Sequence, residues 1–198
     1  MDILCLDLEG VLIPEVWQAV ASATGVVALQ KTTRDIPDYD ELMQYRLGIL
    51  REQGIRMSDI VAQIDKLEPL PGAKAFLDWA RGSFQVAIIS DTFYEFAKPL
   101  MNKLGQPMLL CHQLHIENDE IVDYKIRQPD PKRCSVQAFK SLNYTVYAAG
   151  DSFNVVTMLD EAHHGFFFQA PQNVVEQFPQ YPRAENYTEL QHLLETTK

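Results

Sequence analysis

The sequence predicts an α/β fold: a doubly wound, Rossmann-like, mainly parallel sheet with a small inserted helical cap and a β-hairpin. Three apolar runs support this prediction, because each of them ends in polar side chains: residues 3–9, 86–92 and 146–152. Continuous apolar runs are typical of strands that are buried on both faces, as in parallel sheets. From residue 72 onward such runs alternate with helical patterns, which favours a parallel sheet with right-handed crossovers.

The first run ends in two carboxylates, Asp7 and Glu9, and is followed by Gly10. A glycine at this position allows the backbone to turn away sharply. The second run ends on the hydroxyl of Ser90 and the third on the carboxylate of Asp151. Ligands of open α/β sheets bind beyond the carboxyl ends of the strands. We therefore expect these side chains to meet at one edge of the sheet, where chemistry takes place.

Residues 14–71 differ from their surroundings because they contain helical patterns and no strand-like run. Apolar side chains recur about every three to four residues, as in an amphipathic helix. We expect a helical cap at 14–71, inserted into a core formed by 1–13 and 72–198. Its expected helices start at Pro14 and stop at Gly25, run from Tyr39 to Gln53 before Gly54, and run from Asp59 to Leu67 with Ser58 as N-cap.

The remaining elements follow in regular order after the cap. Periodicity and turn signals predict helices at 73–81, 94–104, 131–142 and 155–162, and two more near the end of the chain. They predict strands at 84–89, 108–111, 145–149 and 165–168. Residues 115–117 and 121–125 flank Asn118 and Asp119 and are expected to form the hairpin.

Composition narrows the class of protein. The chain has 198 residues, 46% hydrophobic and 22% charged, which is typical of one globular domain with a modest insertion. Its formal net charge of −10 argues against nucleic-acid binding, which needs a basic surface, and disfavours an acidic membrane surface. An anionic substrate is not excluded, because a metal or a local group of cations can reverse the field inside a cleft.

The cysteines and the start of the chain indicate a cellular compartment. Cys5, Cys111 and Cys134 are odd in number and widely spaced, so we expect free thiols in a reducing compartment. No apolar run reaches the roughly 18 residues of a membrane span, and the first strand begins at once without a cleavable leader. A cytoplasmic protein is expected. The oligomeric state is left open, with a homodimer as one outcome.

Four motifs together resemble those of the haloacid dehalogenase-like phosphatases: Asp-Leu-Glu-Gly-Val at 7–11, Ser-Asp-Thr at 90–92, Lys132, and Gly-Asp-Ser-Phe-Asn at 150–154. The helical segment at 14–71 lies where the phosphoserine phosphatase-like branch of this family has its cap. Four ordered motifs plus a cap are a specific combination, whereas any one of them alone would be a weak signal.

Within that branch the chain most resembles the phosphoserine phosphatase/homoserine phosphotransferase type. Further matches are Thr-Thr-Arg-Asp-Ile-Pro-Asp-Tyr-Asp at 32–40, Ser-Asp-Thr-Phe-Tyr-Glu-Phe at 90–96 and Asp-Pro-Lys-Arg at 130–133. The resemblance covers nearly the whole chain. It implies Mg²⁺-dependent hydrolysis of O-phosphoserine through an aspartyl-phosphate, with homoserine as an alternative acceptor of the phosphoryl group.

The resemblance also implies roles for the first and last motifs. Asp7 would be the nucleophile, and Glu9 would protonate the leaving alkoxide and later take a proton from the acceptor. The family commonly has aspartate at the position of Glu9, but the transferase type is expected to have glutamate. Asp7, Asp151 and the backbone carbonyl of Glu9 would supply oxygen ligands for Mg²⁺. Asn154 would contact the substrate. Alternatively, Asn154 caps the start of a helix.

The middle motifs would bind the phosphate. Ser90 and Lys132 would hold its non-bridging oxygens, and Lys132 would also keep Asp7 ionised. Asp91 and Thr92 are included in the same substrate-binding motif, although either one, like Ser90, could instead cap the next helix. Arg133, which follows Lys132 directly, is the rival cation.

Arg46 is informative without any family. It lies four residues from Leu42 and from Leu50, on the apolar stripe of its predicted helix, where an unpaired arginine is rare. Either its stem lies along the apolar surface and its head reaches the edge, or its guanidinium faces a cleft and binds a carboxylate with two hydrogen bonds. The resemblance implies that Arg46 binds the substrate carboxylate and Glu15 the ammonium group. By itself, Glu15 is also a routine acid at the start of a helix.

The fourth motif departs from the family at Val155, where aspartate is usual and lies near the metal. Valine has no lone pair, so we expect weakened metal affinity. Two alternatives remain open: a phosphomonoesterase for another small substrate, and a phosphoamino-acid-binding protein without turnover. The histidines suggest no zinc site, because they are adjacent or lie on or near strands.

Overall fold

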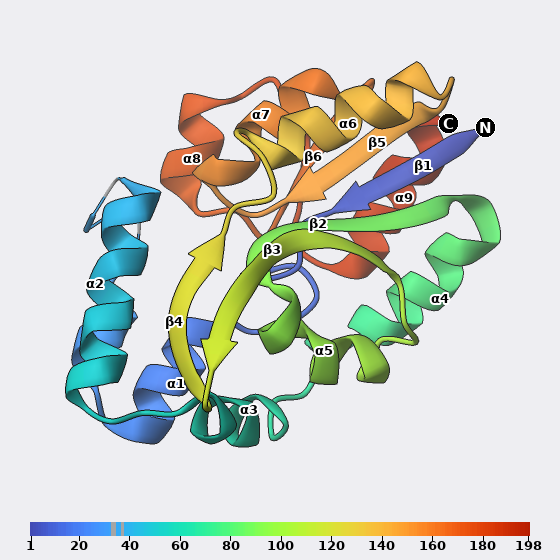
Figure 1. Cartoon of the computed structure of the whole chain (residues 1–198). Coiled ribbons are helices and arrows are strands. Elements are labelled where there is room, and N and C mark those ends of the chain that lie inside the picture. The colour runs from blue at the N-terminus through green and yellow to red at the C-terminus, as the bar shows by residue number, and fades with distance from the viewer. Residues whose placement is uncertain (33–34, 37) are drawn as a thin grey trace.

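The computed structural model describes residues 1–32, 35–36 and 38–198, and in them a single sheet carries helices on both faces (Figure 1). The strand order is β4-β3-β2-β1-β5-β6-β7. Neighbouring strands are parallel except β3 and β4, which form an antiparallel hairpin. The strands are β1 (Asp2–Leu6), β2 (Gln85–Phe93), β3 (Met108–Glu117), β4 (Glu120–Lys125), β5 (Thr145–Gly150), β6 (His164–Phe168) and β7 (Arg183–Ala184). The predicted α/β class is confirmed.

Side chains alternate between two cores along the strands, because successive residues of a strand point to opposite faces. Leu4 and Leu6 of β1 lie in one buried cluster, and Ile3 and Cys5 lie in the other. Helices α4, α5 and α9 contribute to the first cluster, and α6, α7 and α8 to the second. These helices are α4 (Ala73–Ser83), α5 (Tyr94–Lys103), α6 (Pro131–Ser141), α7 (Val156–Glu161), α8 (Gln172–Gln177) and α9 (Tyr187–Thr197).

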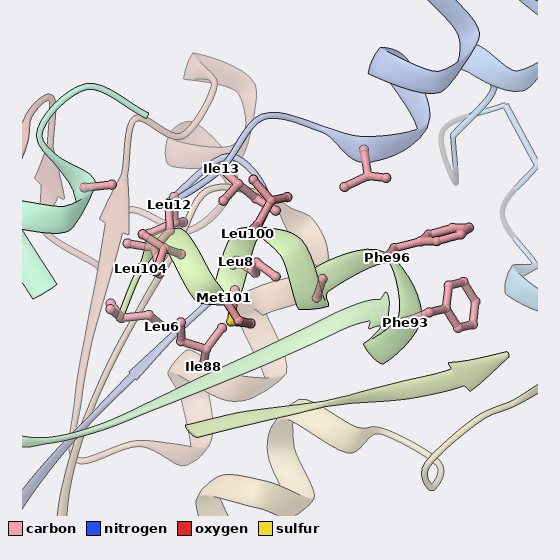
Figure 2. Close-up of a cluster of buried hydrophobic side chains, with 14 of the residues drawn as sticks. Leu6, Leu8, Leu12, Ile13, Ile88, Phe93, Phe96, Leu100, Met101 and Leu104 are labelled. Carbon is pink, nitrogen blue, oxygen red and sulfur yellow. The ribbon is translucent and has the colours of Figure 1, made fainter. Parts of the chain in front are cut away.

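The first core continues from the sheet to the inserted helices. Figure 2 shows its central part, where Leu6 of β1, Ile88 of β2 and Leu100 of α5 belong to one buried cluster. Phe93 and Phe96 extend away from that group, and Phe96 meets the ring of Trp17 edge-on at 5.4 Å between centroids. The apolar interior is therefore shared by the sheet and the inserted segment.

The described part of 14–71 contains helices and no strand, as the sequence predicts. They are α1 (Val16–Thr24), the short 3₁₀ helix η1 (Val27–Gln30), α2 (Tyr39–Glu52) and α3 (Met57–Ile64). The tip of the β3–β4 hairpin contacts α3, because Asp119 accepts hydrogen bonds from Met57 N–H and Ser58 N–H at 2.9 Å each. The division into a cap at 14–71 and a core remains a prediction.

Two predicted helix starts are wrong. Ser58 is not an N-cap: α3 begins one residue earlier, and Ser58 donates its own hydroxyl to Asp119 at 2.5 Å. The hairpin tip accepts the free N–H groups that an N-cap side chain would otherwise satisfy. Pro14 does not begin α1 either, since the helix starts at Val16 after Glu15 in extended backbone geometry.

Strand lengths also differ from the prediction. β2 continues past Ile89 to Phe93, and the predicted pieces 108–111 and 115–117 are one strand, β3. Pairing explains both extensions, because Phe93 lies opposite His112 beyond an irregularity in the β2–β3 ladder. The two-residue strand β7 and the helix η1 were not predicted.

Two expectations about cysteines and membranes can be compared with the structure. Cys5, Cys111 and Cys134 are free thiols, as predicted, and the first two are buried. Among the helices of the described residues, none is both long and apolar enough to cross a membrane.

Candidate active site

The carboxyl ends of β1, β2 and β5 converge on Asp7. Its N–H donates to the carbonyl of Ala149 at 3.0 Å, which continues the β1–β5 ladder by one residue. Gly10 then turns the chain with a φ of 74°, a value that glycine adopts without strain. A side chain at Gly10 would collide with the carboxylate of Asp151, whose Oδ2 lies 2.2 Å from the position a Cβ would occupy. Two carboxylates and a close backbone turn thus share this edge.

Lys132 and Asp7 form a buried ion pair. Lys132 Nζ lies 2.7 Å from Asp7 Oδ2, and the Lys132 side chain is 2% exposed. Lys132 is the second residue of α6, at a helix end whose dipole disfavours a cation. The facing carboxylates must therefore stabilise the ammonium. Arg133, the rival cation, is exposed instead and pairs with Glu161 at 3.1 Å.

Burial and the partner's charge act in opposite directions on the pKa of each member of this ion pair. Burial raises the pKa of Asp7 to about 6, although the Lys132 charge opposes this shift. The charges of Asp151 and Asp91 raise it further. Burial by itself would lower the pKa of Lys132, but the charges of Asp7 and Asp91 outweigh it and raise that pKa. At neutral pH the pair is therefore an ionised carboxylate held by an ammonium.

Glu9 is a second carboxyl group of the site and, unlike Asp7, is protonated at neutral pH. Its Oε1 accepts the N–H of Val16 at 3.2 Å, at the start of α1. Burial is the main cause that raises the pKa of Glu9 to about 8, and the charge of Glu15 adds to it. Arg46 lowers it by a smaller amount. Glu9 thus carries a proton at neutral pH.

Asp91 is the centre of a second group of contacts. Its Oδ2 lies 3.3 Å from Lys132 Nζ and accepts from Asn154 Nδ2 at 3.0 Å. Its backbone carbonyl accepts the hydroxyl of Tyr39, from the first residue of α2, at 2.9 Å. The motif residue Asp91 therefore connects α6, the short 3₁₀ helix η2 (Phe153–Val155) after β5, and the inserted helices.

Ser90 and Thr92 are buried inside β2 and not beyond it. Ser90 Oγ accepts the N–H of Thr92 at 3.2 Å. Thr92 contacts the site through this backbone group, and no hydrogen bond of its side chain to another site residue is found in the described part of the chain. The extended strand aligns Ser90 with the ends of β1 and β5, since Leu6 of β1 lies opposite Ile88.

Arg46 reaches the site from α2 with part of its hydrogen-bonding capacity unused. Its guanidinium lies 4.5 Å over the ring of Trp17, and Nη2 donates to the carbonyl of Lys31 at 2.7 Å. Nε is buried and has no hydrogen-bond partner among the described residues. Burial lowers the pKa of Arg46, while the charges of Tyr39 and Glu9 act in the opposite direction. A buried donor without a partner is a feature that a bound anion would satisfy.

Glu15 lies at the N-terminal end of α1, close enough to influence two site residues. Its charge raises the pKa of Glu9 and that of Asp151. Thr33, Arg34 and Pro37 of the 32–40 match lie outside the described residues. The structure thus brings all the predicted site residues to one region, although Thr92 contributes through its backbone.

The donors present fit a hard cation such as Mg²⁺. Burial raises the pKa of Asp151, as it does that of Asp7, and Asp7 shares the ammonium of Lys132 with Asp91, so a further cation would stabilise these carboxylates. In residues 1–32, 35–36 and 38–198, no three His, Cys, Asp or Glu side chains are grouped as a metal site requires. Two carboxylates and the Glu9 carbonyl would leave positions for water, as Mg²⁺ prefers.

Val155 is part of the apolar core. It is fully buried in the second cluster, and its side chain lies so close to Gly150 that a Cβ there would be 2.4 Å from Val155 Cγ1. The usual family carboxylate is thus replaced by a side chain that packs under the end of β5.

Two residues near the site were missed from the sequence. Tyr39 lies two helical turns before Arg46, a spacing that places both on one face of α2 and could have indicated it. His112 is buried in β3 with Nε2 3.9 Å from Asp91 Oδ1. It is one of the histidines for which the sequence suggests no zinc site, and no sequence signal connects it to Asp91, because the two are adjacent only through the β2–β3 pairing.

Comparisons with known proteins agree with the geometry. A family model described as haloacid dehalogenase-like hydrolase matches residues 1–163. The phosphoserine phosphatase ThrH of Pseudomonas aeruginosa is 59% identical over 191 residues, which cover 96% of this chain and 93% of that protein. A phosphoserine phosphatase of Pseudomonas syringae pv. tomato is 58% identical over 191 residues, which cover 96% and 81% of the two chains.

Solved structures share the fold at low identity. A phosphoserine phosphatase described as a phospho-aspartyl intermediate analogue has a TM-score of 0.80 at 16% identity and covers 98% of each chain. The phosphoserine phosphatase of T. onnurineus has a TM-score of 0.76 at 21% identity, covering 96% of this chain and 92% of that one. Since the family model spans most of the chain and two relatives align over nearly all of it, this protein belongs to the haloacid dehalogenase-like hydrolase family.

Proposed function

We propose that this protein is a Mg²⁺-dependent phosphoserine phosphatase that works through an aspartyl-phosphate on Asp7 and also transfers the phosphoryl group to homoserine. The observation that carries this proposal is the buried Asp7–Lys132 ion pair, with the buried carboxyl of Glu9, whose pKa is raised to about 8, in the same site. Burial raises both carboxyl pKa values, that of Asp7 to about 6 and that of Glu9 to about 8, so one group can act as a nucleophile and the other as an acid at neutral pH.

The reaction follows from these protonation states. The Asp7 carboxylate attacks phosphorus, the bond from phosphorus to the serine oxygen breaks, and the proton of Glu9 passes to that oxygen. Glu9 is then a carboxylate and takes the proton of an attacking hydroxyl, which releases the phosphoryl group from Asp7. Lys132 and Ser90 bind the phosphoryl oxygens throughout and stabilise their charge.

The inserted helices would recognise the amino-acid part of the substrate. Arg46 has a buried Nε without a partner, so its guanidinium is suited to a carboxylate. The charge of Glu15 raises the pKa of Glu9, which indicates that the two side chains are near each other. Glu15 would bind the ammonium group of the substrate. We propose residues 14–71 as a cap that excludes water from the phosphoryl group, which transfer to an alcohol requires.

Asp7, Asp151 and the Glu9 carbonyl would hold Mg²⁺, and Asn154 would support the site through Asp91. When bound, this ion supplies positive charge for the phosphate oxygens and relieves the repulsion between the two carboxylates.

The test of this function is phosphate release from O-phosphoserine, with and without Mg²⁺. Metal-dependent release is expected, and in the presence of homoserine part of the phosphate should appear as phosphohomoserine. A phosphomonoesterase for a different substrate would release phosphate faster from phosphorylated alcohols that lack the carboxylate. A binding protein would show thermal stabilisation by phosphoserine without release.

Arg46→Lys is expected to raise the KM for O-phosphoserine by roughly 10- to 100-fold, since one lost charge-assisted hydrogen bond costs about 1.5–3 kcal/mol. Lysine keeps the charge but cannot form a two-bond contact with a carboxylate. Steady-state kinetics on the variant and the parent protein measure this change.

Phosphoethanolamine is the matched control substrate for Arg46→Lys, because it has the phosphate and the ammonium but no carboxylate. The KM for phosphoethanolamine should stay within about twofold of the parent value, because this substrate has no carboxylate for Arg46 to bind. An equal rise for both substrates would show that Arg46 acts on the structure of the site and not on the carboxylate.

Val155→Asp is expected to lower the free energy of unfolding by about 3 kcal/mol and the melting temperature by about 10 °C. The new carboxylate would enter an apolar cluster in which Val155 is fully buried. In the family pattern a carboxylate at this position lies near the metal, so the Mg²⁺ concentration for half-maximal rate should fall by about 10-fold.

Val155→Asn is the control for this change, because it has nearly the same shape as aspartate without the charge. The asparagine variant should lose stability but keep the Mg²⁺ requirement of the parent protein. An unchanged Mg²⁺ requirement and rate in Val155→Asp would show that this position does not influence the metal.

A further inference from the structure

His112 is a buried histidine that the proposed reaction does not use. It lies in β3 with 3% of its surface exposed, opposite Phe93 of β2. The rings of Tyr39 and Phe93 enclose it, with centroids 5.8 Å and 6.1 Å away. A polar ring in such surroundings needs partners for both of its nitrogens.

The contacts of His112 determine which nitrogen bears the proton. Nδ1 accepts the N–H of Arg127 at 3.2 Å, so it must be unprotonated. Burial lowers the pKa of His112, and the ring is neutral at neutral pH. A neutral imidazole with an acceptor at Nδ1 has its hydrogen on Nε2.

Nε2 faces the carboxylate of Asp91. The distance from Nε2 to Asp91 Oδ1 is 3.9 Å, longer than a hydrogen bond, so the contact is electrostatic. The other oxygen, Oδ2, binds Lys132 Nζ at 3.3 Å and Asn154 Nδ2 at 3.0 Å. The two oxygens of Asp91 thus have separate partners: His112 on one side, Lys132 and Asn154 on the other.

This arrangement bears on Lys132. Its ammonium is held by Asp7 Oδ2 at 2.7 Å and by Asp91 Oδ2 at 3.3 Å, which leaves one of its three hydrogens for the phosphate. If Asp91 rotated, the direction of that free hydrogen would change. The charges that act on His112 come from Asp91 of β2, Lys132 of α6 and Arg127 after β4.

We propose that His112 is a positioning residue of the active site: its Nε2–H orients the carboxylate of Asp91, and Asp91 in turn directs the ammonium of Lys132 at the phosphoryl group. This inference rests on the proposed function for the role of Lys132. His112 itself touches neither the substrate nor the reacting atoms.

The test is a pair of variants that separate the two nitrogens. The amide of glutamine reaches the position of Nε2, so His112→Gln keeps a donor toward Asp91 and loses the acceptor for Arg127 N–H. Asparagine reaches only the position of Nδ1, so His112→Asn keeps that acceptor and loses the donor. His115→Asn, at an exposed position of the same strand, is the control for an asparagine in β3.

For His112→Asn we expect kcat for O-phosphoserine to fall by about 10-fold, the scale on which outer partners of catalytic groups act. KM should change by less than about twofold, because the Arg46 contact is intact. His112→Gln should restore kcat to within about threefold of the parent protein. Equal losses in both variants, or a larger loss with glutamine, would overturn the proposal and assign His112 to the structure around Arg127.

Two further readouts separate this inference from the proposed function. If the parent protein hydrolyses p-nitrophenyl phosphate but not phosphoserine, the substrate assignment fails, and the same order of variants is still required on that substrate. Nitrogen-15 NMR of the imidazole needs no substrate at all. It should report the Nε2–H tautomer, with a resonance that shifts in Asp91→Asn; an Nδ1–H tautomer would overturn the inference even if phosphoserine is the substrate.

Discussion

Asp7→Asn is expected to reduce phosphate release by about 10⁴-fold or more, the scale on which an enzyme responds to the loss of its nucleophile. An amide oxygen forms no stable phosphoryl ester, so neither hydrolysis nor transfer to homoserine should remain. Initial rates at saturating Mg²⁺ measure the loss. Acid-stable labelling of the parent protein with phosphate, absent in the variant, would place the intermediate on Asp7.

The folded state should tolerate this substitution. Burial raises the pKa of Asp7 to about 6, above its value of 3.8 as a free side chain, so folding disfavours the ionised carboxylate at neutral pH. Asparagine removes that cost but weakens the contact with Lys132, which still pairs with Asp91. We expect a melting temperature within about 4 °C of the parent, equivalent to about 1 kcal/mol. Rates above 1% of the parent value would contradict the nucleophile assignment.

The parts of the fold that the sequence predicted are those with strong local patterns. The buried runs that became β1 and β5 are continuous and apolar, and each is followed by a polar residue, so the start of each strand was predicted to within one residue. Helix α2 was predicted almost in full, because its apolar stripe is followed by Gly54 in left-handed geometry. Local periodicity and a turn residue are enough to predict an element where distant packing contacts do not change its bounds.

The errors occur where a distant segment determines the outcome. Ser58 has the chemistry of an N-cap, but Asp119, 61 residues away, accepts the free N–H groups of α3. The break that was predicted within β3 lies at residues 112–114, where His112 and Leu114 are buried and Gln113 is exposed along a continuous strand. No pattern within a few residues of these positions contains that information.

The candidate site shows the same division. Asp7, Glu9, Ser90 and Asp151 were predictable because strand ends in a parallel sheet converge at one edge. The apolar stripe around Arg46 indicated an unusual arginine, but not its contact with the carbonyl of Lys31. Contacts between elements, such as those of Asp91, require the three-dimensional structure.

Lys132→Met is expected to lower the rate of phosphate release by about 10³-fold, the scale of losing one preorganised donor at a site of developing charge. It should also lower the free energy of unfolding by about 3 kcal/mol, because the buried carboxylate of Asp7 loses its ammonium partner while Asp91 loses one of its contacts. Activity assays and thermal unfolding measure the two effects separately.

The destabilisation should depend on pH in a defined direction. Without Lys132, the folded-state pKa of Asp7 rises above about 6, since the ammonium lowers it in the parent protein. A carboxyl group whose pKa is raised by folding binds a proton as the pH falls through that value, and this binding stabilises the folded state. The gap in melting temperature between the variant and the parent should therefore be large near about pH 8 and shrink toward about pH 5.

Arg133→Met is the matched control, because it removes the same charge one residue later from the same helix. Arg133 is 53% exposed and pairs with Glu161 on the surface, a contact worth about 1 kcal/mol or less. Arg133→Met should keep its rate within about twofold and its melting temperature within about 4 °C of the parent values. The difference in melting temperature between Arg133→Met and the parent should not change with pH. Equal losses in both variants would mean that the chain responds to net charge. A rate loss confined to Lys132→Met, together with the pH-dependent gap, would identify the buried ammonium as the partner of Asp7, because only that cation faces a carboxylate that is almost fully shielded from water.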